Sequence, residues 1–288
     1  MARAAIVLLI AALLTGCSPA SAPTPVETTP VVTSPSVAPS PTRSSPAATA
    51  TSARTPTKTA AATPSGVAKP LAGRRIVVDP GHNGVWIRAL ARQVPAGNGR
   101  TKPCNSSGTA GGSLSEHAFT WSLGQALVER LKKLGAEVVL TRPDDNGSGP
   151  CVNVRARITN DADADLLVSL HADGNPANGA RGYHLIVSST MVGGSTVERR
   201  SLALARDLRA ALDATRTMPH STYIGGGTAI HARSDIAGLN LIRVPGVMLE
   251  LGNMRNQRDL ALQRSPSWRS IVARALAGGD TGNRISIK

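Results

Sequence analysis

The sequence is poor in aromatic residues, and this lack argues against one class of protein. Its 288 residues include one phenylalanine, two tyrosines and three tryptophans. Proteins that bind single-stranded nucleic acid stack bases on aromatic side chains, and no nucleic-acid-binding motif is present. The formal net charge of +14 therefore does not indicate nucleic acid as the partner.

The sequence also lacks an apolar run long enough to cross a bilayer as a helix. The longest run, Ala4 to Leu14, follows the single charge of Arg3 and has the length of the apolar region of a secretory signal. It ends in Leu14-Thr15-Gly16-Cys17, which resembles the lipobox of bacterial lipoproteins, where the cysteine is diacylated after cleavage. We therefore expect a signal peptide over residues 1–17, a lipid on Cys17, and a location at the outer face of the cytoplasmic membrane or in the cell wall. The alternatives are an ordinary signal peptide cut nearby, or a signal retained as an anchor.

Residues 18–72 have almost no clusters of aliphatic side chains. The segment consists largely of Pro, Ser, Thr, Ala and Val, and it cannot bury enough apolar surface to offset the entropy of ordering. We expect a disordered tether with an r.m.s. reach of roughly 40 Å, followed by one folded domain over residues 73–288. For an exported chain, anionic wall polymers and phospholipid head groups are the expected counterparts of the positive charge.

Cysteine is scarce as well. With Cys17 assigned to the lipid, Cys104 and Cys151 remain, and both lie in loops rich in Gly, Pro and Asn. In an exported chain we expect them to form a disulfide. A zinc site made of thiolates is the alternative, but it would need further Cys or His at close spacing.

The folded part alternates apolar strands with amphipathic helices, which predicts a three-layer α/β sandwich with a mostly parallel or mixed central sheet. Expected strands lie near residues 76–80, 136–141, 166–170, 182–188 and 247–251, and expected helices near 114–134, 152–161, 198–212 and 267–276. Ser113-Leu114-Ser115-Glu116 has the form of a capping box with Ser113 as N-cap. Residues 83–112 form a long irregular insert, and residues 218–232 are expected to be a loop.

Four chemical side chains lie at the ends of these elements. His82 and His171 each follow an apolar strand, and Glu116 lies at a helix start. Glu250 lies inside an otherwise apolar strand, where a carboxylate is costly to bury unless it is paired or binds a metal. Two histidines and a glutamate supply the three ligands of a catalytic zinc site, and a further glutamate can accept a proton from water. Each residue also has a purely structural explanation, so the prediction depends on their occurring together.

The chain resembles the zinc-dependent N-acetylmuramoyl-L-alanine amidases of the Amidase_3 type over about residues 75–276. The resemblance lies in six segments: Val78-Asp79-Pro80-Gly81-His82, Glu116 at a helix start, Leu140-Thr141-Arg142, Arg157-Ile158-Thr159-Asn160, Ala164 to Asp173, and Val244 to Gly252. It implies Zn²⁺ bound by His82, Glu116 and His171, Glu250 as the catalytic glutamate, and Arg157 and Asn160 as framework positions. The implied reaction is hydrolysis of the amide between the lactyl group of N-acetylmuramic acid and the L-alanine of peptidoglycan or muropeptide stems.

The chain departs from the family pattern at His117, where lysine is common, and at Gly252-Asn253-Met254-Arg255-Asn256. The insert 83–112 is not a general family feature, and no wall-binding module is appended. We therefore expect wall binding to depend on the catalytic domain and the tether, and we expect the protein to be a monomer. Two other functions are open: a zinc peptidase acting on another peptide bond of the wall, and a catalytically silent wall-binding lipoprotein.

Overall fold

A six-stranded mixed sheet forms the centre of the fold in the computed structural model, which describes residues 69–278. In spatial order the strands are β6 (Glu137–Leu140), β1 (Arg75–Pro80), β7 (Leu166–Asp173), β10 (Gly246–Asn253), β8 (His184–Ser188) and β9 (Ile230–Arg233). The first four are parallel to one another, β8 is antiparallel to β10, and β9 is parallel to β8. The carboxyl ends of β1, β7 and β10 therefore meet at one edge of the sheet, where ligands bind in open α/β folds.

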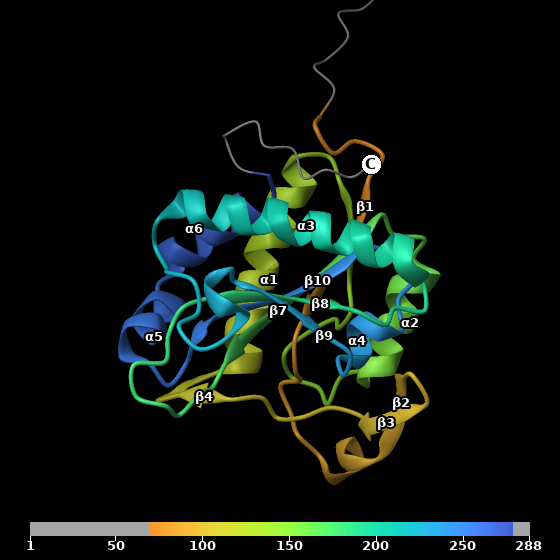
Figure 1. Ribbon diagram of the computed structural model, residues 1–288, viewed down its shortest axis with the longest axis horizontal. Coiled ribbons are helices and arrows are strands. Elements are labelled where there is room, and N and C mark those ends of the chain that lie inside the picture. The colour runs from red at the N-terminus through yellow and green to blue at the C-terminus, as the bar shows by residue number, and fades with distance from the viewer. Residues whose placement is uncertain (1–68, 279–288) are drawn as a thin grey trace, which may run out of the picture. The chain divides into compact units, whose positions relative to one another are not determined.

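Helices cover both faces of the sheet, which confirms the three-layer α/β architecture (Figure 1). The helices are α1 (Glu116–Lys133), α2 (Val152–Asp161), α3 (Gly194–Thr215), α4 (Ala237–Asn240), α5 (Gln257–Arg264) and α6 (Pro266–Leu276). On one face, α1, α3 and α6 build the larger core, which includes Phe119, Leu208 and Trp268. On the other face, a smaller apolar cluster gathers around Leu167, Ile186 and Leu239 beside α2 and α4. Within residues 69–278, no helix is long and apolar enough to cross a membrane.

The insert is more ordered than its composition predicts. It contains a 3-10 helix, Arg88–Ala91, and an antiparallel hairpin of β2 (Gln93–Gly97) and β3 (Arg100–Pro103), which lies at the bottom of Figure 1. Cys104 directly follows the hairpin and forms the predicted disulfide with Cys151, the residue before α2. Both cysteines are buried with Leu90 and Val94 in a small cluster of their own. The disulfide therefore fixes the hairpin to the α2 side of the sheet.

Two further local predictions were wrong. Ser113 is not an N-cap, because it lies in the turn between two short paired strands, β4 (Ala110–Gly111) and β5 (Leu114–Ser115). The helix begins at Glu116, whose N–H donates to the Thr109 carbonyl oxygen (2.9 Å), and Ser115 is its N-cap residue. The expected loop 218–232 contains most of β9, a short half-exposed edge strand that has no clear apolar alternation.

The predicted signal peptide, the lipid site at Cys17 and most of the tether lie outside the described residues. At the start of the described chain, Leu71 is already buried in the larger core, and its N–H donates to the Leu134 carbonyl oxygen (2.9 Å). The predicted boundary at residue 73 thus falls just inside a turn that packs on the domain.

Candidate active site

His82 lies in a tight turn just past the carboxyl end of β1. Its φ of 61° is in the left-handed region, which is uncommon for a residue with a side chain. The preceding Gly81 lies directly against the ring of His171, and a Cβ atom at position 81 would be 2.3 Å from that ring. Glycine at position 81 is therefore needed for the two imidazoles to approach each other.

His82, His171 and Glu116 meet at one point. The distance from His82 Nε2 to Glu116 Oε1 is 2.9 Å, from His171 Nδ1 to Glu116 Oε1 3.0 Å, and from His171 Nδ1 to His82 Nε2 3.1 Å. The three residues come from the β1 turn, the first residue of α1 and the end of β7. They form the one group of His, Cys, Asp and Glu within residues 69–278 whose atoms are placed to hold a metal ion. The three residues predicted as ligands are thus brought together.

Backbone groups fix the orientation of this cluster. Thr109 N–H donates to Glu116 Oε2 (2.9 Å), and Ala172 N–H donates to Glu116 Oε1 (3.0 Å). His82 Nδ1 lies 3.1 Å from the Ser106 carbonyl oxygen. That carbonyl can only accept, so Nδ1 donates to it, and Nε2 is the ring nitrogen that faces the cluster.

The cluster holds Glu116 as a carboxylate. Burial by itself would raise the pKa of Glu116, but hydrogen bonds and charge from His171 and His82 hold the pKa far below its usual range. The pKa of His82 is shifted in the opposite direction. Burial lowers its pKa, but Glu116 more than compensates, and the net pKa is raised. An anionic oxygen and two ring nitrogens at this spacing are suited to binding a cation.

Glu250 lines the same cavity but lies outside this cluster. It is paired in register with His171 across β10 and β7, so its side chain is on the face of the sheet that carries α2 and α4. Its Oε2 atom is enclosed and has no hydrogen-bond partner among residues 69–278. Burial raises its pKa well above the usual value, the charges of Glu116 and Asp173 raise it further, and Arg233 opposes them. This oxygen is therefore free to accept or donate a proton in the cavity.

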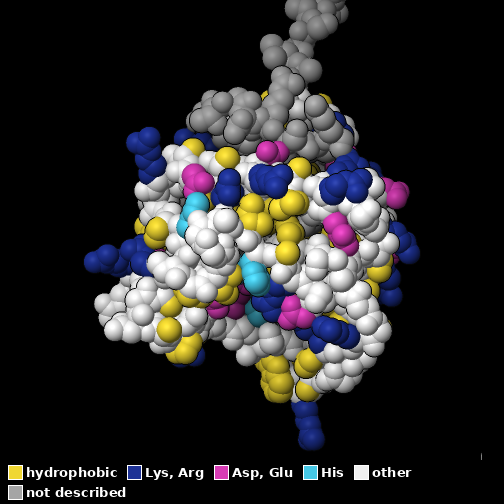
Figure 2. Space-filling model, viewed as in Figure 1, with side chains coloured by type: hydrophobic (Ala, Val, Ile, Leu, Met, Phe, Trp, Pro, Cys, Tyr) yellow, Lys and Arg dark blue, Asp and Glu magenta, His cyan; other side chains and the backbone are white. Residues whose placement is uncertain are grey.

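The cavity has a volume of about 420 Å³, and the insert forms one of its walls. Its lining includes Lys102, Pro103 and residues 105–109 from the insert, and Ile236 with the first two residues of α4. Gly108 lies so close that a Cβ atom there would be 2.8 Å from Glu116 Oε2 and 2.9 Å from the His82 ring. In Figure 2, histidine, acidic and basic side chains lie close together near the middle of the visible face. The insert thus borders the site and leaves a cavity beside it.

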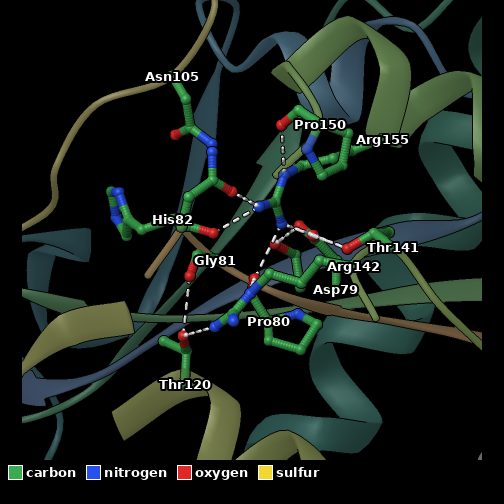
Figure 3. Close-up of polar contacts among 12 residues, drawn as sticks. Asp79, Pro80, Gly81, His82, Asn105, Thr120, Thr141, Arg142, Pro150 and Arg155 are labelled. Carbon is green, nitrogen blue, oxygen red and sulfur yellow. Dashed lines mark hydrogen bonds and ion pairs between the residues drawn. The ribbon is translucent and has the colours of Figure 1, made fainter. Parts of the chain in front are cut away.

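A buried arginine lies beside the His82 turn and supports it through hydrogen bonds (Figure 3). Arg155 of α2 donates to Asp79 Oδ1 (2.5 Å), to the Pro80 carbonyl oxygen (2.8 Å) and to the His82 carbonyl oxygen (2.5 Å). Asp79 also accepts from Ser169 Oγ (2.6 Å) and from the Thr141 hydroxyl (2.5 Å). Each of these buried polar groups therefore has a partner, as a low-dielectric interior requires.

A second buried arginine ties the same turn to the start of α1. Arg142 donates from Nε to the Pro80 carbonyl oxygen (2.9 Å) and from a terminal nitrogen to the His117 carbonyl oxygen (2.8 Å). The His117 side chain pairs with the Asp145 carboxylate. The Arg142 guanidinium also forms an ion pair with that carboxylate, at 2.7 Å from Asp145 Oδ1. The two loops that carry His82 and Glu116 are thereby joined.

The framework prediction is correct for one residue and wrong for the other. Asn160 bridges two segments, since it donates to the Leu241 carbonyl oxygen (2.9 Å) and accepts from Arg243 N–H (2.8 Å). Arg157 is exposed, and Arg155 has the buried role instead. Arg155 lies on the inward helical face with Ala156 and Thr159, so an arginine at an inward position was the signal for it.

The protein is thus a three-layer α/β sandwich with a candidate metal site at the ends of its parallel strands. Two histidines and a glutamate form that site, and a further carboxyl group lies in the same cavity. Within this class of fold, the chain belongs to the N-acetylmuramoyl-L-alanine amidase family, Amidase_3, whose model matches residues 76–279.

Similar proteins agree with this assignment. The N-acetylmuramoyl-L-alanine amidase Rv3717 of Mycobacterium tuberculosis is 42% identical over 224 residues, which cover 77% of this chain and 90% of the relative. The crystal structure of the apo form of the N-acetylmuramyl-L-alanine amidase Ami1 from Mycobacterium abscessus matches with a TM-score of 0.68 and 44% identity, over 72% of this chain and 96% of that one. Ami1 from Mycobacterium smegmatis matches with the same TM-score and 41% identity, over 72% and 94% of the two chains.

Proposed function

We propose that this protein is a zinc-dependent amidase that hydrolyses the bond between the lactyl group of N-acetylmuramic acid and the L-alanine of peptidoglycan stem peptides. One observation carries the proposal. Three donor atoms lie 2.9–3.1 Å from one another, and Glu250 shares their cavity with an unpartnered oxygen. Membership of the amidase family supplies the substrate class.

The donor set fits zinc. Zinc takes histidine nitrogen and carboxylate oxygen in tetrahedral sites with ligand distances of about 2.0–2.2 Å, and catalytic sites use three protein ligands. Such a site separates neighbouring ligand atoms by about 3.3 Å, close to the spacing of His82, Glu116 and His171. The Ser106 carbonyl on His82 Nδ1 is the type of outer partner that orients zinc-binding histidines. When bound, the ion would polarise the scissile carbonyl group and lower the pKa of a water molecule.

Glu250 would move the proton. Its Oε2 accepts a proton from the attacking water and donates it to the departing amine of L-alanine, as a general base and then a general acid. Burial and the neighbouring carboxylates raise its pKa, which favours return of the proton to the amine. A cation held by the three ligands would counter that rise and keep Glu250 ionised before the reaction.

We also propose the arrangement of the rest of the chain. Residues 1–17 would direct export, Cys17 would carry a lipid, and the following segment would tether the catalytic domain within reach of the wall. The protein would act as a monomer outside the cytoplasmic membrane, without a nucleic-acid partner. Replacing Cys17 by alanine should abolish fatty-acid labelling and release the protein from the membrane fraction, and an unlabelled wild-type protein would contradict the anchor.

Mass analysis of digested peptidoglycan tests the reaction. The amidase should release intact stem peptides and leave stem-free glycan, whereas a wall peptidase would leave shortened stems on the glycan. A protein that binds the wall and releases no fragment would be a silent binder. The matched control is Glu250→Gln, which keeps the size of the side chain and removes the proton acceptor.

A further inference from the structure

Strand β3 contributes a positively charged side chain, Lys102, to the cavity wall, and the proposed reaction gives it no role. Lys102 lines the cavity and is half-buried. Among the described residues, its ammonium group has no carboxylate partner and makes one hydrogen bond, to the Asp235 carbonyl oxygen at 3.3 Å. The Asp235 carboxylate is already occupied by Arg233, which donates to it twice, at 2.8 and 2.6 Å.

Lys102 differs in this respect from the other basic residue of the cavity wall. Arg155 is buried, and Asp79 and backbone carbonyl groups occupy its guanidinium. Burial lowers the pKa of Lys102, although Asp235 opposes this. An anionic ligand at this position would offset the desolvation of the ammonium.

The position of Lys102 is fixed by the surrounding structure. The disulfide at Cys104 is two residues away, and Asn240 Nδ2 holds the other strand of the hairpin through the Ala96 carbonyl oxygen (2.9 Å). Asn98 at the hairpin tip donates to Thr190 Oγ1 (2.7 Å) and to the Ser234 carbonyl oxygen (3.3 Å). A hairpin held in this way keeps the backbone of Lys102 in place, so that binding a ligand requires little further ordering of the chain.

Apart from Lys102, Arg155 and the two histidines, the charged side chains of the cavity wall are acidic, so the positive charge of Lys102 opposes theirs. Asp173, Glu116 and Glu250 are among them, so an anionic substrate would be repelled without a compensating positive charge. The acidic residue that follows L-alanine in a peptidoglycan stem brings such a carboxylate within two residues of the scissile bond.

On the basis of the proposed function, we infer that Lys102 is a specificity-determining residue that binds the carboxylate of the stem-peptide residue next to L-alanine. The insert would then contribute to substrate selection as well as bordering the site. Because that carboxylate takes no part in the bond changes of the reaction, the contact should act mainly on KM.

Two substrates that differ in one group test the inference. They are N-acetylmuramoyl-L-alanyl-D-glutamic acid with a free α-carboxylate and the same compound with that carboxylate amidated. The wild-type full-length protein should favour the carboxylate by about tenfold in kcat/KM, the size expected of a partly buried ion pair. Lys102→Met should reduce this preference to about twofold or less, and Lys102→Arg should retain most of it.

Arg100→Met is the matched control, because it removes one positive charge from the same strand at an exposed position outside the cavity wall. It should keep the wild-type preference. If Lys102 only fastened the hairpin to Asp235, Lys102→Met would lower the melting temperature and leave the ratio of the two substrates unchanged, which would overturn the inference. Equal cleavage of both substrates by the wild-type protein would also overturn it. Cleavage of neither would refute the proposed function, and this inference with it, so the two failures give different results.

Discussion

The two faces of the central sheet are built from the same strands but differ in content. Ile76 and Val78 of β1 point to the face covered by α1, α3 and α6, where the buried side chains form the large apolar core. Val77 and Asp79, between and after them, point to the face of α2 and α4. On β10, Leu249 joins the large core, and the next residue, Glu250, lines the cavity.

This difference shows how one strand can serve stability and chemistry together. Side chains alternate between the faces of a strand, so a polar residue can be placed on one face without disturbing the packing on the other. The large core can then support buried charge on the opposite face, where Asp79, Arg155 and Glu250 lie. Substitutions on the face of α2 and α4 should therefore affect metal binding, whereas those in the large core should affect stability alone.

The largest expected effect is at Arg155. Arg155→Met leaves the Asp79 carboxylate buried without its cation and frees the carbonyl groups of the His82 turn. Breaking a buried ion pair costs about 3–5 kcal/mol, and loss of support for a ligand should weaken zinc affinity by about 10–100-fold. Denaturant unfolding and competitive zinc titration measure the two effects.

Arg157→Met is the control for this variant, two residues further along the same helix and exposed. It should change the free energy of unfolding by less than about 0.5 kcal/mol. If the two variants behave alike, the buried pair does not support the site.

A substitution in the large core should affect stability alone. Leu208 of α3 is fully buried on the face opposite the cavity. Leu208→Ala should reduce the free energy of unfolding by about 2–5 kcal/mol. The folded variant should keep the zinc affinity and turnover of the wild type at low temperature, and a parallel loss of zinc would show that the faces are not separate.

A smaller effect is expected in acid. Burial would raise the pKa of Asp79, but Arg155 and the hydroxyls of Ser169 and Thr141 lower it to about 2. Because the folded-state pKa is below the unfolded value, this carboxylate stabilises the fold above about pH 4. About 2 kcal/mol of that stability should be lost as the pH falls from about 4 to 2.

Ser169→Ala removes one hydrogen bond to the Asp79 carboxylate (2.6 Å) and should move the acid unfolding transition to higher pH. Glu129→Gln, which breaks an exposed ion pair with Lys133, should move the transition little. Unfolding monitored by circular dichroism against pH measures both, and equal shifts would contradict the role of Asp79.

The sequence could predict the parts of the site that depend on local pattern. His82 and His171 follow apolar strands, and the carboxyl ends of parallel strands meet at one edge, so their meeting could be predicted. Glu250 was identifiable as a carboxylate in an apolar strand. The start of α1 at Glu116 was also predictable, although the reason given for it, a cap at Ser113, was wrong.

The remaining features depend on contacts between distant segments. The choice of Arg155 over Arg157 depends on which face of α2 meets Asp79, a residue 76 positions away in sequence. Nothing near Lys102 in the sequence indicates a cavity, because the wall is formed when the hairpin docks on the segment before α4. The edge strand β9 is too short and polar for its alternation to be recognised.

The most direct test of the account compares two glutamates in the same cavity. Purified Glu250→Gln and Glu116→Gln would each be assayed for bound zinc per chain and for turnover of a muropeptide. Glu250→Gln should keep about one zinc ion per chain while turnover falls by about 10²–10⁴-fold, the usual value of general-base assistance. Glu116→Gln should lose zinc and activity together, because a neutral amide is a weak ligand. If Glu250→Gln loses its zinc while Glu116→Gln keeps both zinc and activity, the assignment of ligand and base is contradicted.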